Sequence, residues 1–509
     1  MATLLETLKR VSFFQGIHCP YVLLASIYHV ALPFEGDILD KTACAKKNQI
    51  GPYIADMSLD AEDDSFDIDA ALHGLEGMIQ NEAQAGLMTA ELMIRLDLYL
   101  SGADGHHEKG KRGTAVPSRF LDLTGNPFYY QPIKVSVTGE EATYTIVPRR
   151  KPLHDKWIGK PLPRTQAYFD QNSLAARCLE YHRLFRDERV GGQRVIFPAN
   201  GASTSKHLSF LQSFEPSGKA LQSLTIALAP YDAGFEPQLL PYERTEGGMI
   251  PFRYVRTASP SLSDVKTRIE AILTAAIDRG VDILIFPELV VDHDARTKIG
   301  RFLCHQNTSG QLKLVVAGSF HSEWGEGGYV NQAPMFDWQG NIVWRHNKLS
   351  RYALRHEEMG KSPKGVSLQE SLNTKAGDRM QENIHISHPL AFVDTPIGRI
   401  ATLICLDYLQ EAVIRTVREI GCDFLLVPLM TTSIDTFESH AWNLYGAKLH
   451  VLSACSASVS CCEMFGSGVK SLSFLYAPSR NFAELGKYPG RTQDEKLPLI
   501  IYRLDKTHL

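Results

Sequence analysis

The chain has 509 residues, which is too long for one ordinary hydrophobic core and predicts at least two domains. Its formal net charge of −4 is small for this length and argues against bulk affinity for nucleic acid. The nine cysteines are an odd number without C-x-x-C spacing, which favours a reduced, cytoplasmic protein over a disulfide framework or a zinc site. The most apolar early run, 21–32, is interrupted by His29 and is too short to span a bilayer, so we expect no membrane segment.

The first 215 residues are assigned to an N-terminal domain of mixed α and β structure. Periodic apolar residues predict a helix over 70–100, with a break near Gly86. Alternation over 129–147, around the turn residues 138–141, predicts a β-hairpin. A second helix is predicted over 171–187, and glycines and small polar residues place a domain boundary between about 190 and 220.

Three polar segments of this domain allow a binding interpretation beside a simpler one. The acidic segment 59–69 lacks the register of an EF-hand calcium loop, which favours a solvated loop. His106-His107-Glu108 offers metal-ligand side chains, but it lies in a glycine-rich segment with no partner nearby. The basic stretch 149–164 suits phosphate or RNA, although its prolines also suit an exposed linker. We therefore predict no metal and no nucleic acid partner, and leave a protein partner open for this domain.

From residue 221 to residue 509, strand and helix patterns alternate. Apolar runs predict strands at 224–229, 281–286, 313–318, 424–428, 451–457, 472–477 and 499–504, and hairpins at 333–344 and 391–404. Helices are predicted over 262–279 and around 437–448. The alternation indicates an α/β domain with a mixed sheet.

Three of these strand-like runs deliver reactive side chains at their ends. Cys405 ends the run 400–404 and is followed by a helical pattern that Gly421 closes. Glu288 ends the run 281–286, and a buried carboxylate there is costly unless it is paired or does chemistry. Lys348 ends the run 342–347. Alone, Cys405 is more readily a small buried apolar residue than a nucleophile, but thiol, carboxylate and ammonium together supply a nucleophile, a base and an electrostatic stabiliser.

The three segments Phe286-Pro-Glu-Leu289, His346-Asn-Lys-Leu349 and Ile404-Cys-Leu-Asp407 resemble, in this order, the glutamate, lysine and cysteine motifs of the nitrilase superfamily of carbon–nitrogen hydrolases. The resemblance covers about 221–509 and implies a four-layer α-β-β-α sandwich. It implies that Glu288 takes the proton of Cys405, and that Lys348 and the backbone N–H of Leu406 stabilise an oxyanion. It calls for no metal or organic cofactor.

The family often has a second glutamate shortly after the lysine. Glu357 and Glu358 stand nine and ten residues after Lys348, and Glu357 is favoured, with a solvated role equally open for both. The polar segment 358–386 is expected to be an inserted loop near the pocket mouth, acting as a lid or a partner surface. Expected pocket residues are Leu406, Tyr352, Met430 and Thr431.

The resemblance implies a thiol amidohydrolase that cleaves a non-peptide amide or carbamoyl bond, and less readily a nitrile. It also implies a homodimer or larger homo-oligomer with a small-molecule substrate. The alternative is an oligomerising scaffold in which the C-terminal domain is inactive and the N-terminal domain binds a macromolecule. The joint presence of Glu288, Lys348 and Cys405 favours the enzyme.

Overall fold

The structure is a computed structural model in which the chain divides into two compact units. The first comprises residues 1–150 and 163–190, and the second comprises residues 151–162 and 191–509. No helix in the described part of the chain is long and apolar enough to cross a membrane. The residues that the structure describes are 20–34, 38, 85–86, 89–90, 92–94, 96–97, 132–137, 140–148, 182–186, 194–196, 210, 213–214, 223–230, 238–241, 245, 248–255, 262–325, 328–360, 363–386, 389–395, 397–431, 433–446, 451–457, 473–476 and 499–505.

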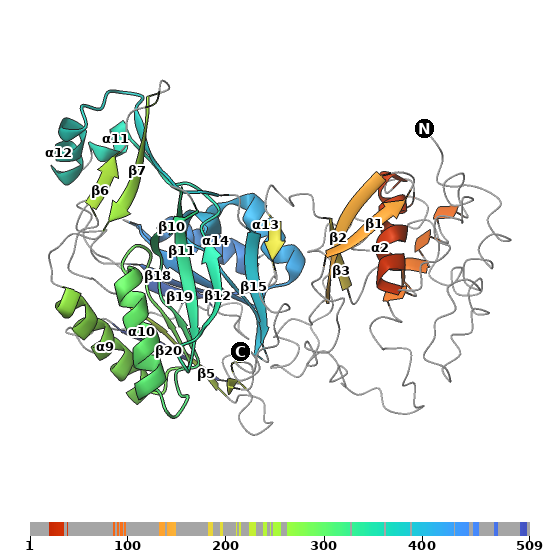
Figure 1. Cartoon of the computed structure of the whole chain (residues 1–509), viewed down its shortest axis with the longest axis horizontal. Coiled ribbons are helices and arrows are strands. Elements are labelled where there is room, and N and C mark those ends of the chain that lie inside the picture. The colour runs from red at the N-terminus through yellow and green to blue at the C-terminus, as the bar shows by residue number, and fades with distance from the viewer. Residues whose placement is uncertain are drawn as a thin grey trace. The chain divides into compact units, whose positions relative to one another are not determined.

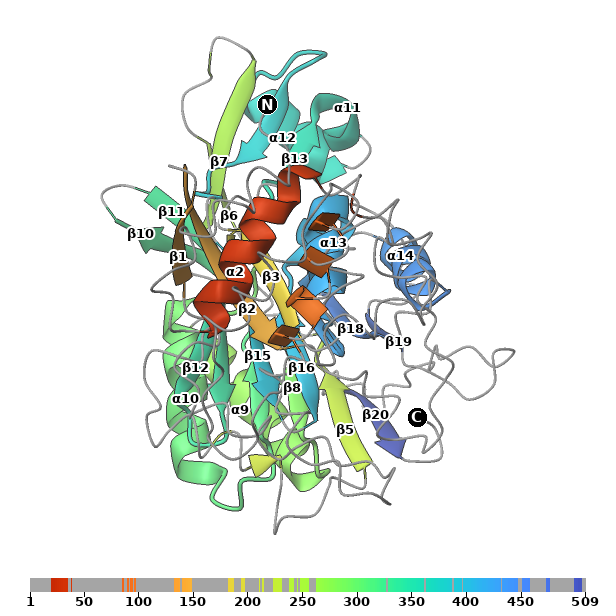
Figure 2. The same cartoon turned by 90° about the vertical axis from the view of Figure 1, so that its right-hand side faces the viewer.

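The first unit contains an antiparallel sheet with strand order β1 (Pro132–Val137), β2 (Glu140–Pro148) and β3 (His182–Arg186). Helix α2 (Pro20–Ala31), followed by the 3₁₀ turn η2 (Leu32–Phe34), packs against β1 and β2 (Figure 2). His29 Nδ1 lies 2.9 Å from the buried hydroxyl of Tyr144, so a polar pair joins helix and sheet.

The first unit confirms the predicted hairpin, because β1 and β2 pair in antiparallel register. The described residues between 85 and 97 are helical, in agreement with the helix predicted over 70–100. The helix predicted over 171–187 is wrong at its C-terminal end, since residues 182–186 form β3. Strand pairing with β2 satisfies the backbone of these residues and overrides the helical pattern. Segments 59–69, 106–108 and 149–164 lie outside the described residues.

The second unit contains two large mixed sheets. The first has the order β10 (Phe320–Trp324), β11 (Gly328–Asp337), β9 (Leu314–Val316), β8 (Ile283–Ile285), β5 (Ser223–Leu228) and β20 (Ile500–Asp505), and β12 (Ile342–Asn347) also pairs with β11. The second has the order β19 (Ser473–Tyr476), β18 (Leu452–Ala457), β17 (Phe424–Leu429), β16 (Gly398–Thr402), β15 (Pro389–Thr395) and β4 (Arg194–Ile196). Central strands are parallel in both sheets, as the βαβ pattern predicts.

Strand β4 shows that the second unit begins before residue 215. It pairs in parallel with β15 at the edge of the six-stranded sheet. Phe210 is also buried, and its ring centroid lies 6.1 Å from that of Trp344 on β12. The structure therefore places the division near residue 190, at the early end of the predicted boundary region.

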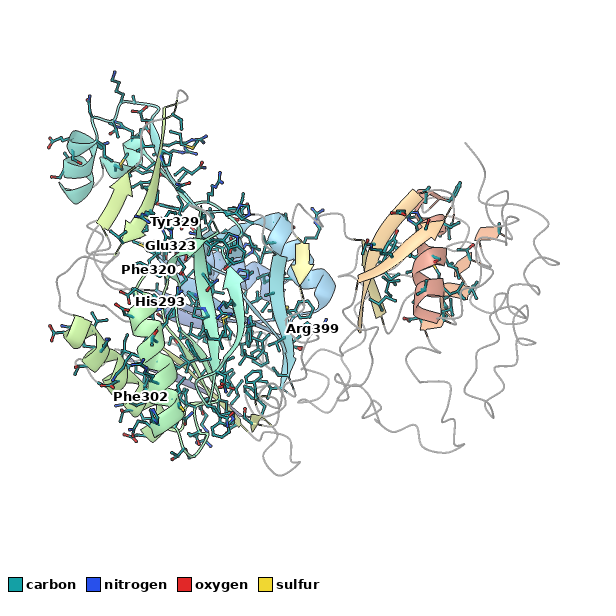
Figure 3. The ribbon with its side chains drawn as sticks, in the orientation of Figure 1. His293, Phe302, Phe320, Glu323, Tyr329 and Arg399 are labelled. Carbon is teal, nitrogen blue, oxygen red and sulfur yellow. The ribbon has the colours of Figure 1, made fainter. Side chains whose placement is uncertain are left out.

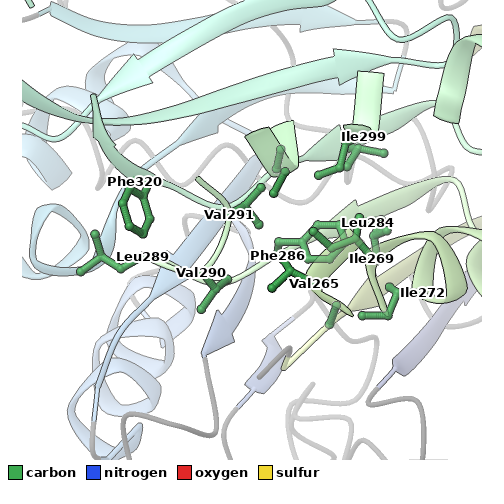
Figure 4. Close-up of a cluster of buried hydrophobic side chains, with 14 of the residues drawn as sticks. Val265, Ile269, Ile272, Leu284, Phe286, Leu289, Val290, Val291, Ile299 and Phe320 are labelled. Atoms are coloured by element: carbon green, nitrogen blue, oxygen red, sulfur yellow. The ribbon is translucent and has the colours of Figure 1, made fainter. Parts of the chain in front are cut away.

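The two large sheets face each other, with contacts of β8 with β17, β5 with β18 and β12 with β15. Helices α9 (Leu262–Asp278) and α10 (His293–Gln306) lie beside the seven-stranded sheet, and α13 (Glu411–Ile420) and α14 (Asp435–Gly446) lie beside the six-stranded sheet (Figures 1 and 2). The inner faces of α9 and α10 join the apolar core of the first sheet (Figure 4). Burial of this apolar surface is the main force that holds helices and sheet together.

A smaller four-stranded sheet in the second unit has the order β13 (Ala353–Arg355), β14 (Arg379–Glu382), β7 (Met249–Val255) and β6 (Gln238–Pro241). The short helix α11 (His356–Met359) and helix α12 (Pro363–Ser371) are next to it in sequence and in space (Figure 1). The segment 358–386, predicted as an inserted loop, thus contains a helix and a strand. Its strand is fixed by parallel pairing of β14 with β7, which lies more than a hundred residues earlier.

Candidate active site

Glu288 stands just beyond β8, at the point where the chain turns into the apolar core. Its backbone N–H donates to the carbonyl of Leu429 at 3.2 Å, and the residue forms a bridge with Ser319. The next residue, Leu289, has a left-handed backbone with φ of 59°. Leu289, Val290 and Val291 are buried in the hydrophobic cluster (Figure 4). The apolar packing of the residues that follow Glu288 therefore fixes the backbone from which its buried carboxylate projects.

Lys348 follows β12 and is 2% exposed at its side chain. Its Nζ donates to Glu288 Oε1 at 2.9 Å and to Glu382 Oε2 at 2.8 Å. Its backbone N–H donates to the carbonyl of Asn331 on β11 at 2.7 Å, which fixes the end of the strand. The ammonium group is thus held between two carboxylates away from water.

Cys405 follows β16 and begins the 3₁₀ turn η7 (Cys405–Leu409) with φ of 48°. A left-handed conformation is unusual for a residue with a side chain and stores about 1–3 kcal/mol of strain. Its thiol donates to the carbonyl oxygen of Met430 at 3.5 Å, and the side chain of Glu288 is close enough for its charge to raise the thiol pKa. The predicted helix begins only at Glu411, after η7, and ends at Gly421 as expected.

The second glutamate beside Lys348 is Glu382, the last residue of β14. Its Oε2 accepts from Lys348 Nζ and from the backbone N–H of Tyr352, the latter at 3.0 Å. The structure does not bring Glu357 or Glu358 to the lysine. Both lie on α11, where Glu357 accepts from Gly377 N at 3.4 Å and Glu358 accepts from Arg355 N at 3.0 Å. The structure thus corrects the predicted position of this carboxylate, because α11 and α12 separate it from the lysine by more residues than expected.

Two further polar residues on the β10–β11 hairpin complete the cluster and were not predicted. The hairpin is marked by Phe320, Glu323 and Tyr329 in Figure 3. The side-chain amide of Asn331 donates to Glu288 Oε1 at 2.9 Å and to Glu382 Oε1 at 3.0 Å. His321 Nε2 lies 2.8 Å from Glu382 Oε1. Neither residue ends an apolar run, so only the hairpin register places them here.

The protonation of the cluster follows from burial and charge. Burial raises the pKa of Glu288, and the attraction of Lys348 opposes the rise without cancelling it. Burial would also raise the pKa of Glu382, but Lys348 and His321 outweigh it and hold that pKa well below its usual range. Burial alone would lower the pKa of Lys348, but the two carboxylates outweigh burial and raise this pKa above its usual value. The surroundings therefore favour the charged forms of Lys348 and Glu382 and the protonated form of Glu288.

The thiol of Cys405 is protonated at rest. Burial, and then the negative charge of Glu288, raise its pKa well above the usual value. A thiolate forms here only if a base removes the proton during attack. The adjacent carboxylate of Glu288 is suited to that step.

The other predicted pocket residues lie around Cys405 and Lys348 with different exposure. Leu406 and Met430 are half-buried, and Thr431 turns its hydroxyl to the carbonyl of Ser433 at 2.6 Å. Tyr352 is 37% exposed, and its backbone N–H contacts Glu382. Within the described residues, no group of three or more His, Cys, Asp and Glu side chains is arranged to hold a metal ion.

No protein-family model matches the chain, and no curated protein matches it. Among solved structures, Nit3 of Saccharomyces cerevisiae, a member of branch 10 of the nitrilase superfamily, is 14% identical and has a TM-score of 0.33, with coverage of 56% of this chain and 90% of its own. An amidase from Nesterenkonia sp. is 15% identical with a TM-score of 0.33, and coverage is 56% of this chain and 92% of its own. A glutamine-dependent NAD+ synthetase from Acinetobacter baumannii is 16% identical with a TM-score of 0.34, and coverage is 56% of this chain and 46% of its own.

The solved structures that the chain is similar to include members of the nitrilase superfamily. At such low identities and TM-scores the likeness does not assign an activity, so the function proposed below rests on the side chains of the site.

Proposed function

We propose that the second unit is a nitrilase-superfamily domain, a four-layer α-β-β-α sandwich, and that it is a thiol amidohydrolase for a non-peptide amide or carbamoyl bond. One observation carries the proposal. The carboxylate of Glu288 accepts from Lys348 Nζ at 2.9 Å inside a buried cluster, and it is close enough to the thiol of Cys405 for its charge to raise the thiol pKa, so base, nucleophile and cation are neighbours.

The reaction begins when Glu288 accepts the Cys405 proton as sulfur attacks the carbonyl carbon. The negative charge that develops on the carbonyl oxygen is stabilised by the Lys348 ammonium and the backbone N–H of Leu406. Loss of one such donor typically costs about 3 kcal/mol of barrier. Glu288 then gives its proton to the departing nitrogen, which leaves as ammonia or an amine, and an acyl thioester remains on Cys405.

Water completes the cycle in a second step. Glu288, now ionised again, takes a proton from water as its oxygen attacks the thioester carbon, and the thiol regains that proton as the acid product leaves. Glu382 and Lys348 keep their charges throughout, so Lys348 remains available to the oxyanion in both steps. The motif resemblance favours an amide or carbamoyl substrate over a nitrile and suggests a homodimer.

Residue-resolved alkylation tests the proposal. Iodoacetamide is applied to the wild type and to Glu288→Gln, with Cys405→Ala as the control that identifies the labelled site. We expect Cys405 to react at neutral pH and to react at least tenfold more slowly in Glu288→Gln, because the base is gone. A panel of small amides is then screened for released ammonia. A Cys405 that labels equally slowly in both proteins would contradict the enzyme and favour the scaffold alternative.

A further inference from the structure

His321 is a buried histidine between the active-site cluster and the small sheet. Its side chain is 1% exposed. Nε2 lies 2.8 Å from Glu382 Oε1, and Nδ1 lies 2.9 Å from the backbone nitrogen of Tyr254 on β7. The imidazole also packs against the Tyr254 ring, with 5.7 Å between centroids. No substrate atom needs to touch His321, since Glu382 lies between it and Lys348.

The hydrogen bonds fix the tautomer of His321. A backbone N–H can only donate, so Nδ1 accepts from Tyr254 and carries no proton. The proton of the neutral ring is therefore on Nε2, which donates to Glu382. A doubly protonated ring would place an N–H against the N–H of Tyr254. The site thus holds a neutral imidazole whose donor faces the carboxylate.

His321 makes the two carboxylates of the cluster unequal. Asn331 and Lys348 each donate to both Glu288 and Glu382. Glu382 has two donors in addition, His321 Nε2 and the backbone N–H of Tyr352. When two like charges share a site, a proton goes to the carboxylate with fewer donors. Here that carboxylate is Glu288, next to Cys405.

We propose that His321 is a positioning residue that keeps Glu382 an oriented anion, so that Glu288 alone exchanges a proton with Cys405. This inference rests on the proposed function. His321, which is anchored to β7 and touches none of the reacting atoms, then determines which of the two carboxylates accepts the proton. The titratable groups that face the two carboxylates are Lys348 from the end of β12, His321 from β10 and Cys405 from η7.

Two isosteric replacements separate the two contacts of the ring. In His321→Asn the amide oxygen can still accept from Tyr254, but the side chain is too short to reach Glu382. In His321→Gln the longer amide can place its nitrogen near the position of Nε2 and restore the donor. His321→Asn thus keeps the Tyr254 contact without the Glu382 contact, and His321→Gln keeps the Glu382 contact without the Tyr254 contact.

The measurement is the pH dependence of Cys405 alkylation by iodoacetamide, followed by peptide mass spectrometry. In wild type the rate falls at low pH as Glu288 becomes protonated. In His321→Asn the doubly ionised pair loses a donor, so we expect the midpoint of this fall to move to higher pH by about one unit, the shift that one hydrogen bond to a charged group corresponds to. In His321→Gln the midpoint should return close to the wild-type value.

Controls are present in the chain. Exposed Cys304 reports the intrinsic pH dependence of the reagent, and buried Cys422 and Cys455 label only if the second unit unfolds. His29→Asn removes a buried, hydrogen-bonded histidine from the first unit and should leave the Cys405 midpoint unchanged.

The outcomes are distinct. Equal midpoints in wild type and His321→Asn would overturn the role of His321 and leave the proposed hydrolase intact. If the wild-type profile does not depend on Glu288, the proposed function itself fails. Should His321→Asn unfold, ¹⁵N shifts of the wild-type ring, assigned by its disappearance in His321→Gln, decide the matter. The shifts must show a proton on Nε2 and none on Nδ1, and a ring that carries its proton on Nδ1 would overturn the proposal.

Discussion

The carboxylate of Asp407 accepts the backbone N–H of Leu349 with both oxygens, at 3.0 and 3.1 Å. Leu349 follows Lys348, and Asp407 stands two residues after Cys405. Asp407 Oδ2 also accepts from the backbone N–H of Ile404 at 3.3 Å, and the carboxylate is fully buried. One side chain therefore ties the strand that delivers the cation to the turn that delivers the nucleophile.

Asp407→Asn is expected to loosen this link. The amide has one acceptor oxygen, and in either orientation its NH₂ group would face the backbone N–H of Leu349, which cannot accept, while at the Oδ2 position it would also lie near His346 Nε2. An unsatisfied buried donor costs about 1–3 kcal/mol, so the free energy of unfolding should fall by that amount, and Cys405 alkylation should slow. Urea denaturation and peptide-resolved labelling measure the two effects. Asp435→Asn, at an exposed carboxylate that accepts from Ser433 Oγ, is the control and should change stability by no more than about 0.5 kcal/mol.

Glu382→Gln and Glu357→Gln distinguish the carboxylate found in the site from the one that sequence spacing favoured. All four partners of Glu382 are donors, so the amide nitrogen of a glutamine has no acceptor there. Breaking a buried ion pair costs about 3–5 kcal/mol. We expect that loss of unfolding free energy and a large loss of Cys405 reactivity in Glu382→Gln. The exposed Glu357→Gln should behave as wild type in both assays, and a reversed pattern would contradict the assignment.

The loss of unfolding free energy in Glu382→Gln should also depend on pH. The pKa of Glu382 is lowered in the folded state, so its charge contributes stability above the unfolded pKa, and the contribution is lost as pH falls through the folded pKa. The difference in unfolding free energy from wild type should therefore be full at pH 7 and shrink below about pH 4.5. Urea titrations at several pH values measure this.

The sequence predicted those parts of the site that end long apolar strands. Glu288 and Cys405 follow the fully buried strands β8 and β16, and Lys348 follows β12, in which burial is only partial, so all three stand close to a strand end that is visible without any alignment. Glu382 ends a four-residue strand whose only buried neighbour on the same side is Met380, and its partner strand β7 lies far earlier in the chain. Such pairing leaves almost no local pattern, so a nearby glutamate pair was favoured instead. His321 and Asn331 depend likewise on a cross-strand register.

As pH rises, the unfolding free energy of Glu382→Gln should fall relative to wild type, whereas that of Glu288→Gln should increase relative to wild type. The pKa of Glu288 is raised in the folded state, so between the ordinary value of 4.5 and the folded pKa the unfolded chain loses a proton that the folded chain keeps. Wild-type stability is therefore reduced as pH rises through this window. A glutamine has no such proton, so the stability of Glu288→Gln relative to wild type should increase from pH 4.5 to pH 7. A difference that is constant with pH would show that the Glu288 pKa is not raised.

Gly318→Ala tests the packing behind Glu288. Gly318 has φ of 59°, and a Cβ built on it would lie 2.1 Å from the carbonyl oxygen of Pro287, the residue before Glu288. Gly421, which ends α13, has a similar φ of 68° but open space around the same position. Gly421→Ala should therefore cost only the strain of a left-handed alanine, about 1–2 kcal/mol of unfolding free energy. Gly318→Ala should cost more, because the Pro287 backbone must move.

The displacement in Gly318→Ala should also reach the active site. Ser319, the next residue, bridges to Glu288, and its carbonyl accepts from the backbone N–H of Leu289 at 2.7 Å. A shift of Pro287 would therefore carry the Glu288 carboxylate away from Cys405. We expect Cys405 alkylation to slow severalfold in Gly318→Ala and to keep its wild-type rate in Gly421→Ala, although both proteins carry the same added methyl group. Equal rates in the two variants would mean that the Glu288 backbone is held independently of Gly318.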